Sequence, residues 1–140
     1  MHGIRYTDFV LDSMLNLLKQ FSENSNLTTS FIYCSDHGDN IFDYKNTVGH
    51  DYAGHLPNAV VEIPFVVWLS DRYMEKYPIK TAYIRNNKDL PFMSDDLFHL
   101  ILDLQNIETH YFNPSKSVIN SNYKIPEKRI LENEQEYFLK

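Results

Sequence analysis

The stretch Phe31-Ile-Tyr-Cys-Ser-Asp-His-Gly-Asp-Asn40 joins a short apolar run to a carboxylate, an imidazole and a glycine. Because the apolar residues do not alternate with polar ones, the run predicts a strand covered on both faces, as in the centre of a parallel sheet. Ligands of such sheets gather beyond the carboxyl ends of the strands. We therefore expect Asp36 and His37 at a binding site.

The chemistry of Asp36 and His37 indicates a metal. Neighbouring strand residues point to opposite faces, but a turn at Gly38 breaks the alternation and lets both side chains converge. A hard oxygen and a borderline nitrogen together suit Zn²⁺ or another divalent ion. The alternative for this tripeptide alone is a polar turn at the end of a strand.

The composition limits the possible partners. The chain has 140 residues, 43% of them apolar, which fits a single domain over residues 1–140. A formal net charge of −6 argues against a nucleic-acid partner. Cys34 is the only cysteine, so no internal disulfide can form. No apolar stretch approaches the length of a membrane span and no signal-peptide pattern is present, so we expect the chain alone to be soluble.

The segments around the opening stretch predict an α/β fold. Residues 7–23 place apolar side chains at helical spacing, and a strand follows from about Thr29. Residues 36–61 show no clear periodicity, and a loop of that length tends to be functional or disordered. His50 and His55 favour the functional option.

A second strand is predicted over residues 63–69, with Pro64 at its first residue or beside an unpaired position. Ser70 is expected to cap a short helix over residues 71–77. Residues 79–90 fit either a helix or a short strand.

Ser94 is a good N-cap, and Asp95 and Asp96 place negative charge in the first turn of the helix that follows. The apolar face of that helix runs from Leu97 to Leu104. From residue 111 onwards we expect turns, one or two short strands and a loosely held tail.

Five motifs in order resemble the sulfatase-like phosphoethanolamine transferases. They are Arg5-Tyr-Thr-Asp-Phe-Val-Leu11, Tyr33-Cys-Ser-Asp-His-Gly-Asp39, Val48-Gly-His50, Glu62-Ile-Pro-Phe-Val-Val-Trp-Leu-Ser70 and Ser94-Asp-Asp-Leu-Phe-His-Leu-Ile-Leu-Asp-Leu104. At Asp39 the family more commonly has glutamate. The resemblance implies the C-terminal portion of an alkaline-phosphatase-like α/β/α sandwich.

The resemblance also implies an enzyme at the periplasmic face of the bacterial inner membrane. Such enzymes move phosphoethanolamine from phosphatidylethanolamine to lipopolysaccharide through a phosphorylated threonine. Asp36 and His37 fall on two zinc ligands of the family. His50 best matches a later histidine that contacts the phosphoryl group or a second metal, with His55 as its competitor.

Some parts of the family pattern lie outside the match. In the family, the nucleophilic threonine, an acidic metal ligand and the membrane domain precede the first motif, and none of Thr28, Thr29 or Thr47 matches the nucleophile. We therefore expect a C-terminal fragment that is inactive alone. The alternatives are a sulfatase or phosphodiesterase-type hydrolase, or an inert fragment that self-associates through an exposed sheet edge.

Overall fold

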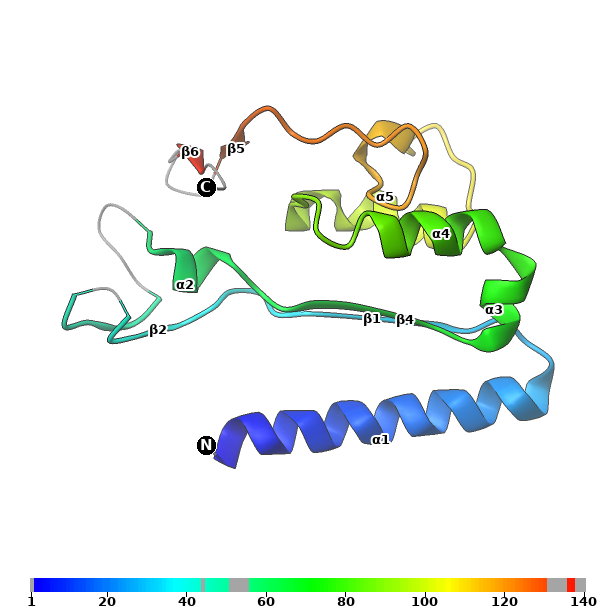
Figure 1. Ribbon diagram of the computed structural model, residues 1–140, viewed down its shortest axis with the longest axis horizontal. Coiled ribbons are helices and arrows are strands. Elements are labelled where there is room, and N and C mark those ends of the chain that lie inside the picture. Colours follow the sequence, from blue (N-terminus) through cyan, green and yellow to red (C-terminus); the bar gives the residue numbers. More distant parts are fainter. Residues whose placement is uncertain (1, 44, 51–55, 131–135, 138–140) are drawn as a thin grey trace. The chain divides into compact units, whose positions relative to one another are not determined.

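The computed structural model describes residues 2–43, 45–50, 56–130 and 136–137. It contains both helices and strands, which confirms the α/β class (Figure 1). The elements are α1 (His2–Ser25), β1 (Ser30–Cys34), β2 (Asn40–Ile41), β3 (Val48–Gly49), α2 (Asn58–Val61), β4 (Phe65–Leu69), α3 (Asp71–Lys76), α4 (Pro78–Asn86), η1 (Ser94–Asp96), α5 (Leu97–Leu104), η2 (Pro114–Lys116), β5 (Arg129–Ile130) and β6 (Glu136–Tyr137).

The chain divides into two compact units. The first comprises residues 1–33 and 66–78, and the second comprises residues 34–65 and 79–140. The single domain predicted from the length stays a prediction.

In the first unit, α1 confirms the helix predicted over residues 7–23 and extends it at both ends. The helix is followed by Asn26, whose backbone is left-handed with φ 60°. Asparagine tolerates this conformation better than most residues, so it can end a helix where glycine would otherwise stand. Arg72 donates to the Asn26 side-chain oxygen and so ties this turn to α3.

The strand β1 pairs with β4, and the two run in opposite directions. The Ser70 amide, just after β4, donates to the Thr29 carbonyl, just before β1, at 3.0 Å. All five β1 residues are partly exposed. The expectation of a parallel strand covered on both faces was therefore wrong. An unbroken apolar run does not determine strand direction, and here the connection from β1 to β4 contains a hairpin in place of a long crossover helix.

The first unit also confirms the predicted cap of α3. The Ser70 hydroxyl accepts a hydrogen bond from the Tyr73 amide at 3.2 Å. It accepts a second one from the Thr29 amide at 3.1 Å. Ser70 therefore links the start of α3 to the start of β1. Pro64 precedes β4, as its missing N–H requires.

In the second unit, the segment predicted to lack periodic structure contains a short hairpin and a helical turn. β2 and β3 are antiparallel, with Asn40 opposite Gly49 and Ile41 opposite Val48. The fully buried Asn40 amide donates to the Thr47 carbonyl at 2.6 Å and to its hydroxyl at 3.0 Å. The described part of this segment therefore contains more regular structure than the sequence indicated.

The core of the second unit forms around α5. Leu100 and Leu104 of α5, together with Val118 and Ile119, are buried. α5 contacts both η1 and η2. The ambiguous segment before it is helical, as α4.

The start of α5 differs in one respect from the expectation. Ser94 is the first residue of η1 and caps no helix, and Asp95 and Asp96 lie in η1, directly before the first turn of α5. Asp96 is buried and pairs with Lys116 at 3.1 Å. The short strands β5 and β6 confirm the strands predicted after residue 111, but the expected loosely held tail does not describe Ser117, Val118 and Ile119, which are buried.

Candidate metal centre

Asp36 and His37 follow directly after β1, at its carboxyl end, as predicted. The turn that follows is held by the Gly38 amide, which donates to the Val60 carbonyl at 2.8 Å. A side chain at Gly38 would place its Cβ 2.0 Å from the Ala59 carbonyl oxygen. Only glycine allows this close approach to α2, so it determines where the chain turns after His37.

The hairpin brings two further site residues together. Asp39 precedes Asn40 and His50 follows Gly49, and these two neighbours are opposite one another in the register of β2 and β3. In an antiparallel pair, one step outward on both strands reaches residues that are again close. The hairpin therefore places Asp39 beside His50 although eleven positions separate them in the sequence.

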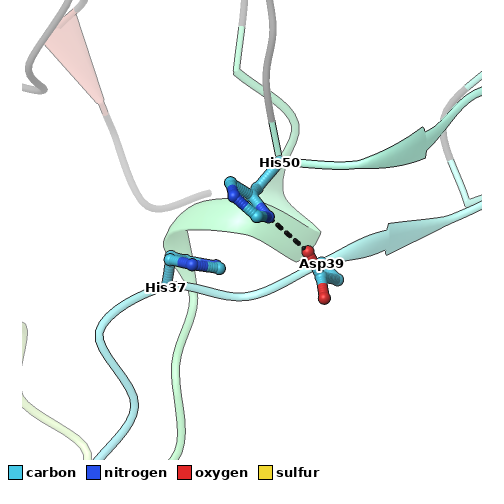
Figure 2. Close-up of side chains that lie close together, drawn as sticks. All are labelled: His37, Asp39 and His50. Atoms are coloured by element: carbon cyan, nitrogen blue, oxygen red, sulfur yellow. Dashed lines mark hydrogen bonds and ion pairs between the residues drawn. The ribbon is translucent and has the colours of Figure 1, made fainter.

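Three side chains converge at the base of this hairpin, from His37, Asp39 and His50 (Figure 2). One ligand atom of each lies within 4.8 Å of those of the others. Asp39 Oδ1 lies 2.8 Å from His50 Nδ1, and the ring centroids of the two histidines are 3.8 Å apart. All three side chains are partly exposed, so an ion or a substrate can reach them.

Hydrogen bonds at the Nδ1 atoms determine which imidazole nitrogen can act as a ligand. His37 Nδ1 lies 3.0 Å from the Gly38 carbonyl oxygen, which can only accept. His37 must therefore carry its proton on Nδ1, and its lone pair lies on Nε2. A neutral imidazole whose Nδ1–H is held by a carbonyl is the usual form of a metal-binding histidine. The hydrogen bond at Nδ1 therefore leaves His37 Nε2 available as a ligand for a divalent ion.

Asp36 lies beside His37 but outside the cluster of three. Its side chain is 88% exposed, and Oδ2 lies 3.8 Å from His37 Nε2. Two ligands that each lie about 2.0–2.2 Å from one ion can be at most about 4 Å apart, so this pair can share an ion. The His37 amide, which donates to Asp36 Oδ1 at 3.0 Å, holds the pKa of this carboxyl below its usual range. Like an ordinary aspartate, this carboxylate is ionised at neutral pH and can bind a cation.

The site residues predicted from the sequence do not all lie in the cluster. The structure brings His37 and His50 together and keeps Asp36 adjacent to His37. His55 lies outside the described residues. Sequence reasoning missed Asp39, although its acidic character at the end of the Asp-His-Gly motif was a signal that could have drawn attention to it.

The sequence matches a known family over most of its length. The family model for sulfatases matches residues 1–107. Phosphoethanolamine transferase EptA of Salmonella typhimurium is 28% identical over 120 residues, which are 83% of this chain and 21% of the relative. Phosphoethanolamine transferase EptC of Escherichia coli is 26% identical over 123 residues, 85% of this chain and 20% of the relative. The chain thus spans about a fifth of the length of these relatives.

Two solved structures resemble the fold. The C-terminal periplasmic domain of phosphoethanolamine transferase EptC from Campylobacter jejuni has a TM-score of 0.67 and 29% identity, covering 86% of this chain and 36% of that domain. The corresponding domain of EcEptC from Escherichia coli has a TM-score of 0.72 and 24% identity, covering 85% and 32%. Within the described ranges, no helix has the length and apolar character needed to cross a bilayer.

Proposed function

This chain belongs to the sulfatase family, and from that premise we propose that it carries part of the divalent-metal site of a phosphoethanolamine transferase. The observation that carries the proposal is the placement of Asp36 Oδ2 3.8 Å from His37 Nε2, with the His50 ring beside that of His37. The donor would be phosphatidylethanolamine and the acceptor lipopolysaccharide, at the periplasmic face of the inner membrane. The curated relatives are transferases of phosphoethanolamine, and this supports the substrate class.

In this proposal Asp36 and His37 hold the ion, which is Zn²⁺ or a similar divalent metal. A bound ion of this kind neutralises the charge that develops on phosphoryl oxygens and favours the deprotonated form of a nucleophile. Asp36 supplies formal charge, and His37 supplies a neutral nitrogen that the Gly38 carbonyl keeps in one tautomer. The oxygen–nitrogen distance of 3.8 Å supports the assignment of both residues to one ion.

His50 acts on the substrate in this proposal. Its ring lies against that of His37, so a phosphoryl group beside the ion would be within reach of it. An imidazole there can donate to a phosphoryl oxygen or protonate a leaving oxygen. The nucleophile would come from a segment of the fold that this chain does not match, because none of Thr28, Thr29 or Thr47 fits the family's motif for it.

A different ligand set uses the same histidine. His37, Asp39 and His50 offer three ligand atoms within 4.8 Å of one another, and a catalytic zinc site needs three protein ligands. The two assignments differ in their acidic member. Loss of Asp36 weakens metal binding in the first, and loss of Asp39 weakens it in the second.

Calorimetric titration of the chain with Zn²⁺ tests the metal site. We expect binding by the wild type, loss of binding in His37→Ala and an affinity reduced by about tenfold or more in Asp36→Ala. His110→Ala is the matched control, because it removes a histidine that stacks on Tyr111, outside the cluster. A wild-type chain that binds no zinc would overturn the metal assignment.

Activity is tested separately. The chain is produced together with the segment of the fold that it does not match, and phosphoester cleavage is measured with and without zinc. We expect zinc-dependent cleavage that is lost in His37→Ala and strongly reduced in Asp36→Ala. Cleavage that neither substitution affects would contradict the catalytic role of these residues.

A second candidate, self-association without catalysis, is favoured by one observation. Several apolar side chains of α1 are exposed, among them Phe9 and Leu17. Exposed apolar faces of this kind promote association. Sedimentation at several concentrations, with and without zinc, separates the two candidates, because a concentration-dependent dimer that binds no zinc fits only the second.

A further inference from the structure

We propose that Asp39 is a positioning residue that holds His50 in the Nδ1–H tautomer, so that Nε2 is the nitrogen presented to the phosphoryl group. This inference rests on the proposed function and deepens it. The family resemblance assigns no role to Asp39. At this position the family more commonly has glutamate. The juxtaposition of its carboxylate with His50 comes from the hairpin alone.

The distance between Asp39 Oδ1 and His50 Nδ1 is that of a hydrogen bond. It is 2.8 Å, within the usual range for a charge-assisted hydrogen bond between nitrogen and a carboxylate oxygen. A proton therefore lies between these two atoms.

The identity of the acceptor then determines the tautomer. An ionised carboxylate has no proton to donate, so the shared proton belongs to His50 Nδ1. Nε2 consequently carries the lone pair in neutral His50. Partners of this kind usually orient the ring as well as select the tautomer.

The surroundings of His50 restrict the ring further. The hairpin holds the backbone on one side through the pairing of Asn40 with Gly49. The His37 ring lies against the His50 ring, with an interplanar angle of 34°. His37 is in turn held through Nδ1 by the Gly38 carbonyl. Both histidines of the cluster thus use Nδ1 for positioning, and both present Nε2.

The tautomer of His50 in the metal-free protein is the direct test. Long-range ¹H–¹⁵N correlation spectra of the ¹⁵N-labelled chain, recorded about two pH units above the usual histidine pKa of about 6.5, distinguish the two ring nitrogens. We expect a protonated Nδ1 and an unprotonated Nε2 for His50. A His50 found mainly in the Nε2–H form would overturn the proposal without any variant, so the test does not depend on a mutant that folds.

Variants then link the tautomer to Asp39. We expect Asp39→Ala to shift His50 towards the Nε2–H form that a solvent-exposed histidine side chain prefers, and Asp39→Glu to restore the Nδ1–H form. Asp89→Ala is the charge-matched control, because Asp89 lies after α4 and pairs only weakly with Lys88, at 3.9 Å. A tautomer unchanged in Asp39→Ala, with the amide spectrum of the folded chain retained, would also overturn the proposal.

The functional consequence is measured in the zinc-dependent assay. Loss of a partner that orients an active-site histidine typically costs about 10–100-fold in activity. We expect a fall of that size in Asp39→Ala, confined to the rate of turnover, with zinc affinity unchanged and with recovery in Asp39→Glu. A lower zinc affinity of Asp39→Ala would indicate that Asp39 is a metal ligand, and this would overturn the positioning role. An inactive wild type whose His50 is still in the Nδ1–H form would contradict the proposed function and leave the Asp39 contact standing.

Discussion

The helices α1 and α5 carry apolar side chains at the same helical spacing, yet their surroundings differ. Leu100 and Leu104 of α5 are at most 1% exposed, whereas Phe9 and Leu17 of α1 are 67% and 69% exposed. The apolar period forms an amphipathic helix in both cases, but the apolar positions of α5 include two buried side chains, whereas Phe9 and Leu17 of α1 are exposed. Helical periodicity therefore predicts the element, while burial depends on what packs against it. Four pairs of substitutions test this difference.

The largest difference is expected between two aspartates. Asp103 of α5 is buried, pairs with Lys80 at 2.9 Å and accepts from the Asn120 amide at 2.8 Å. Asp103→Ala removes the acceptor of the Asn120 amide and the negative charge beside Lys80, which keeps only the Asp103 backbone carbonyl and the Asn106 side-chain oxygen as acceptors. We expect it to lower the free energy of unfolding by about 3 kcal/mol.

Asp12 of α1 is the matched control for that substitution. It is exposed and accepts a hydrogen bond from the Asn16 side-chain amide at 3.1 Å. We expect Asp12→Ala to change stability by no more than about 0.5 kcal/mol. Urea denaturation of both variants measures the difference, and equal losses would contradict the burial of the Asp103 network.

The apolar faces themselves give the next comparison. Leu100→Ala removes a fully buried side chain, so we expect a loss of about 2–5 kcal/mol in the free energy of unfolding. Leu17→Ala removes an exposed one, and we expect a change within about 0.5 kcal/mol. A loss at Leu17 as large as that at Leu100, and dependent on protein concentration, would mean that another copy of the chain covers the α1 face in solution.

Sequence patterns predicted the elements whose signals are local. The helical period of α1, the apolar run of β1 and the Ser70 cap of α3 each depend on neighbouring residues, and all three are present. The direction of β1 relative to β4 depends on a distant partner, and its prediction was wrong. Local patterns contain no information of this second kind.

The candidate site shows the same limit. Asp36, His37 and His50 were predictable from motifs, but the contact of Asp39 with His50 requires the hairpin. Its turn contains Phe42 and Lys45, with φ of 64° and 55°. Glycine or asparagine is usual at such positions and would have allowed the turn to be predicted from the sequence. The buried Asn40 amide holds the hairpin by bonds to Thr47, a contact that no periodicity indicates.

A smaller effect is expected from two glycines. A Cβ at Gly38 would lie 2.0 Å from the Ala59 carbonyl oxygen, so Gly38→Ala must displace backbone. We expect a loss of about 1–3 kcal/mol together with weaker zinc binding, because the turn after His37 moves. At Gly3 of α1 nothing lies within 4 Å, and alanine favours a helix by up to about 1 kcal/mol over glycine.

Denaturation and zinc titration of the two glycine variants provide the measurement. Gly3→Ala should be neutral or stabilising and should bind zinc as the wild type does. A Gly38→Ala variant with wild-type stability and zinc affinity would show that the contact between Gly38 and α2 does not position the site.

The smallest effect concerns two tyrosines at alkaline pH. Burial, with a further contribution from the negative charge of Asp96, raises the pKa of Tyr123 from 10.0 to about 12. Its hydroxyl donates to the Pro91 carbonyl, which also favours the neutral form. Between pH 10 and 12 the unfolded chain therefore releases this proton while the folded chain keeps it, so the free energy of unfolding falls as pH rises through that window.

Tyr123→Phe removes this titration, and we expect a lower stability at neutral pH but a shallower decline above pH 10 than in the wild type. Tyr6→Phe on α1, where the side chain is 70% exposed, should keep the wild-type slope. Urea midpoints recorded from about pH 9 to 12 give both slopes, and the difference between variants cancels the titration of the lysines. If stability fell equally steeply with pH in the wild type and in Tyr123→Phe, the Tyr123 hydroxyl would be exposed to water. The buried core of the second unit would then not include the segment after η2.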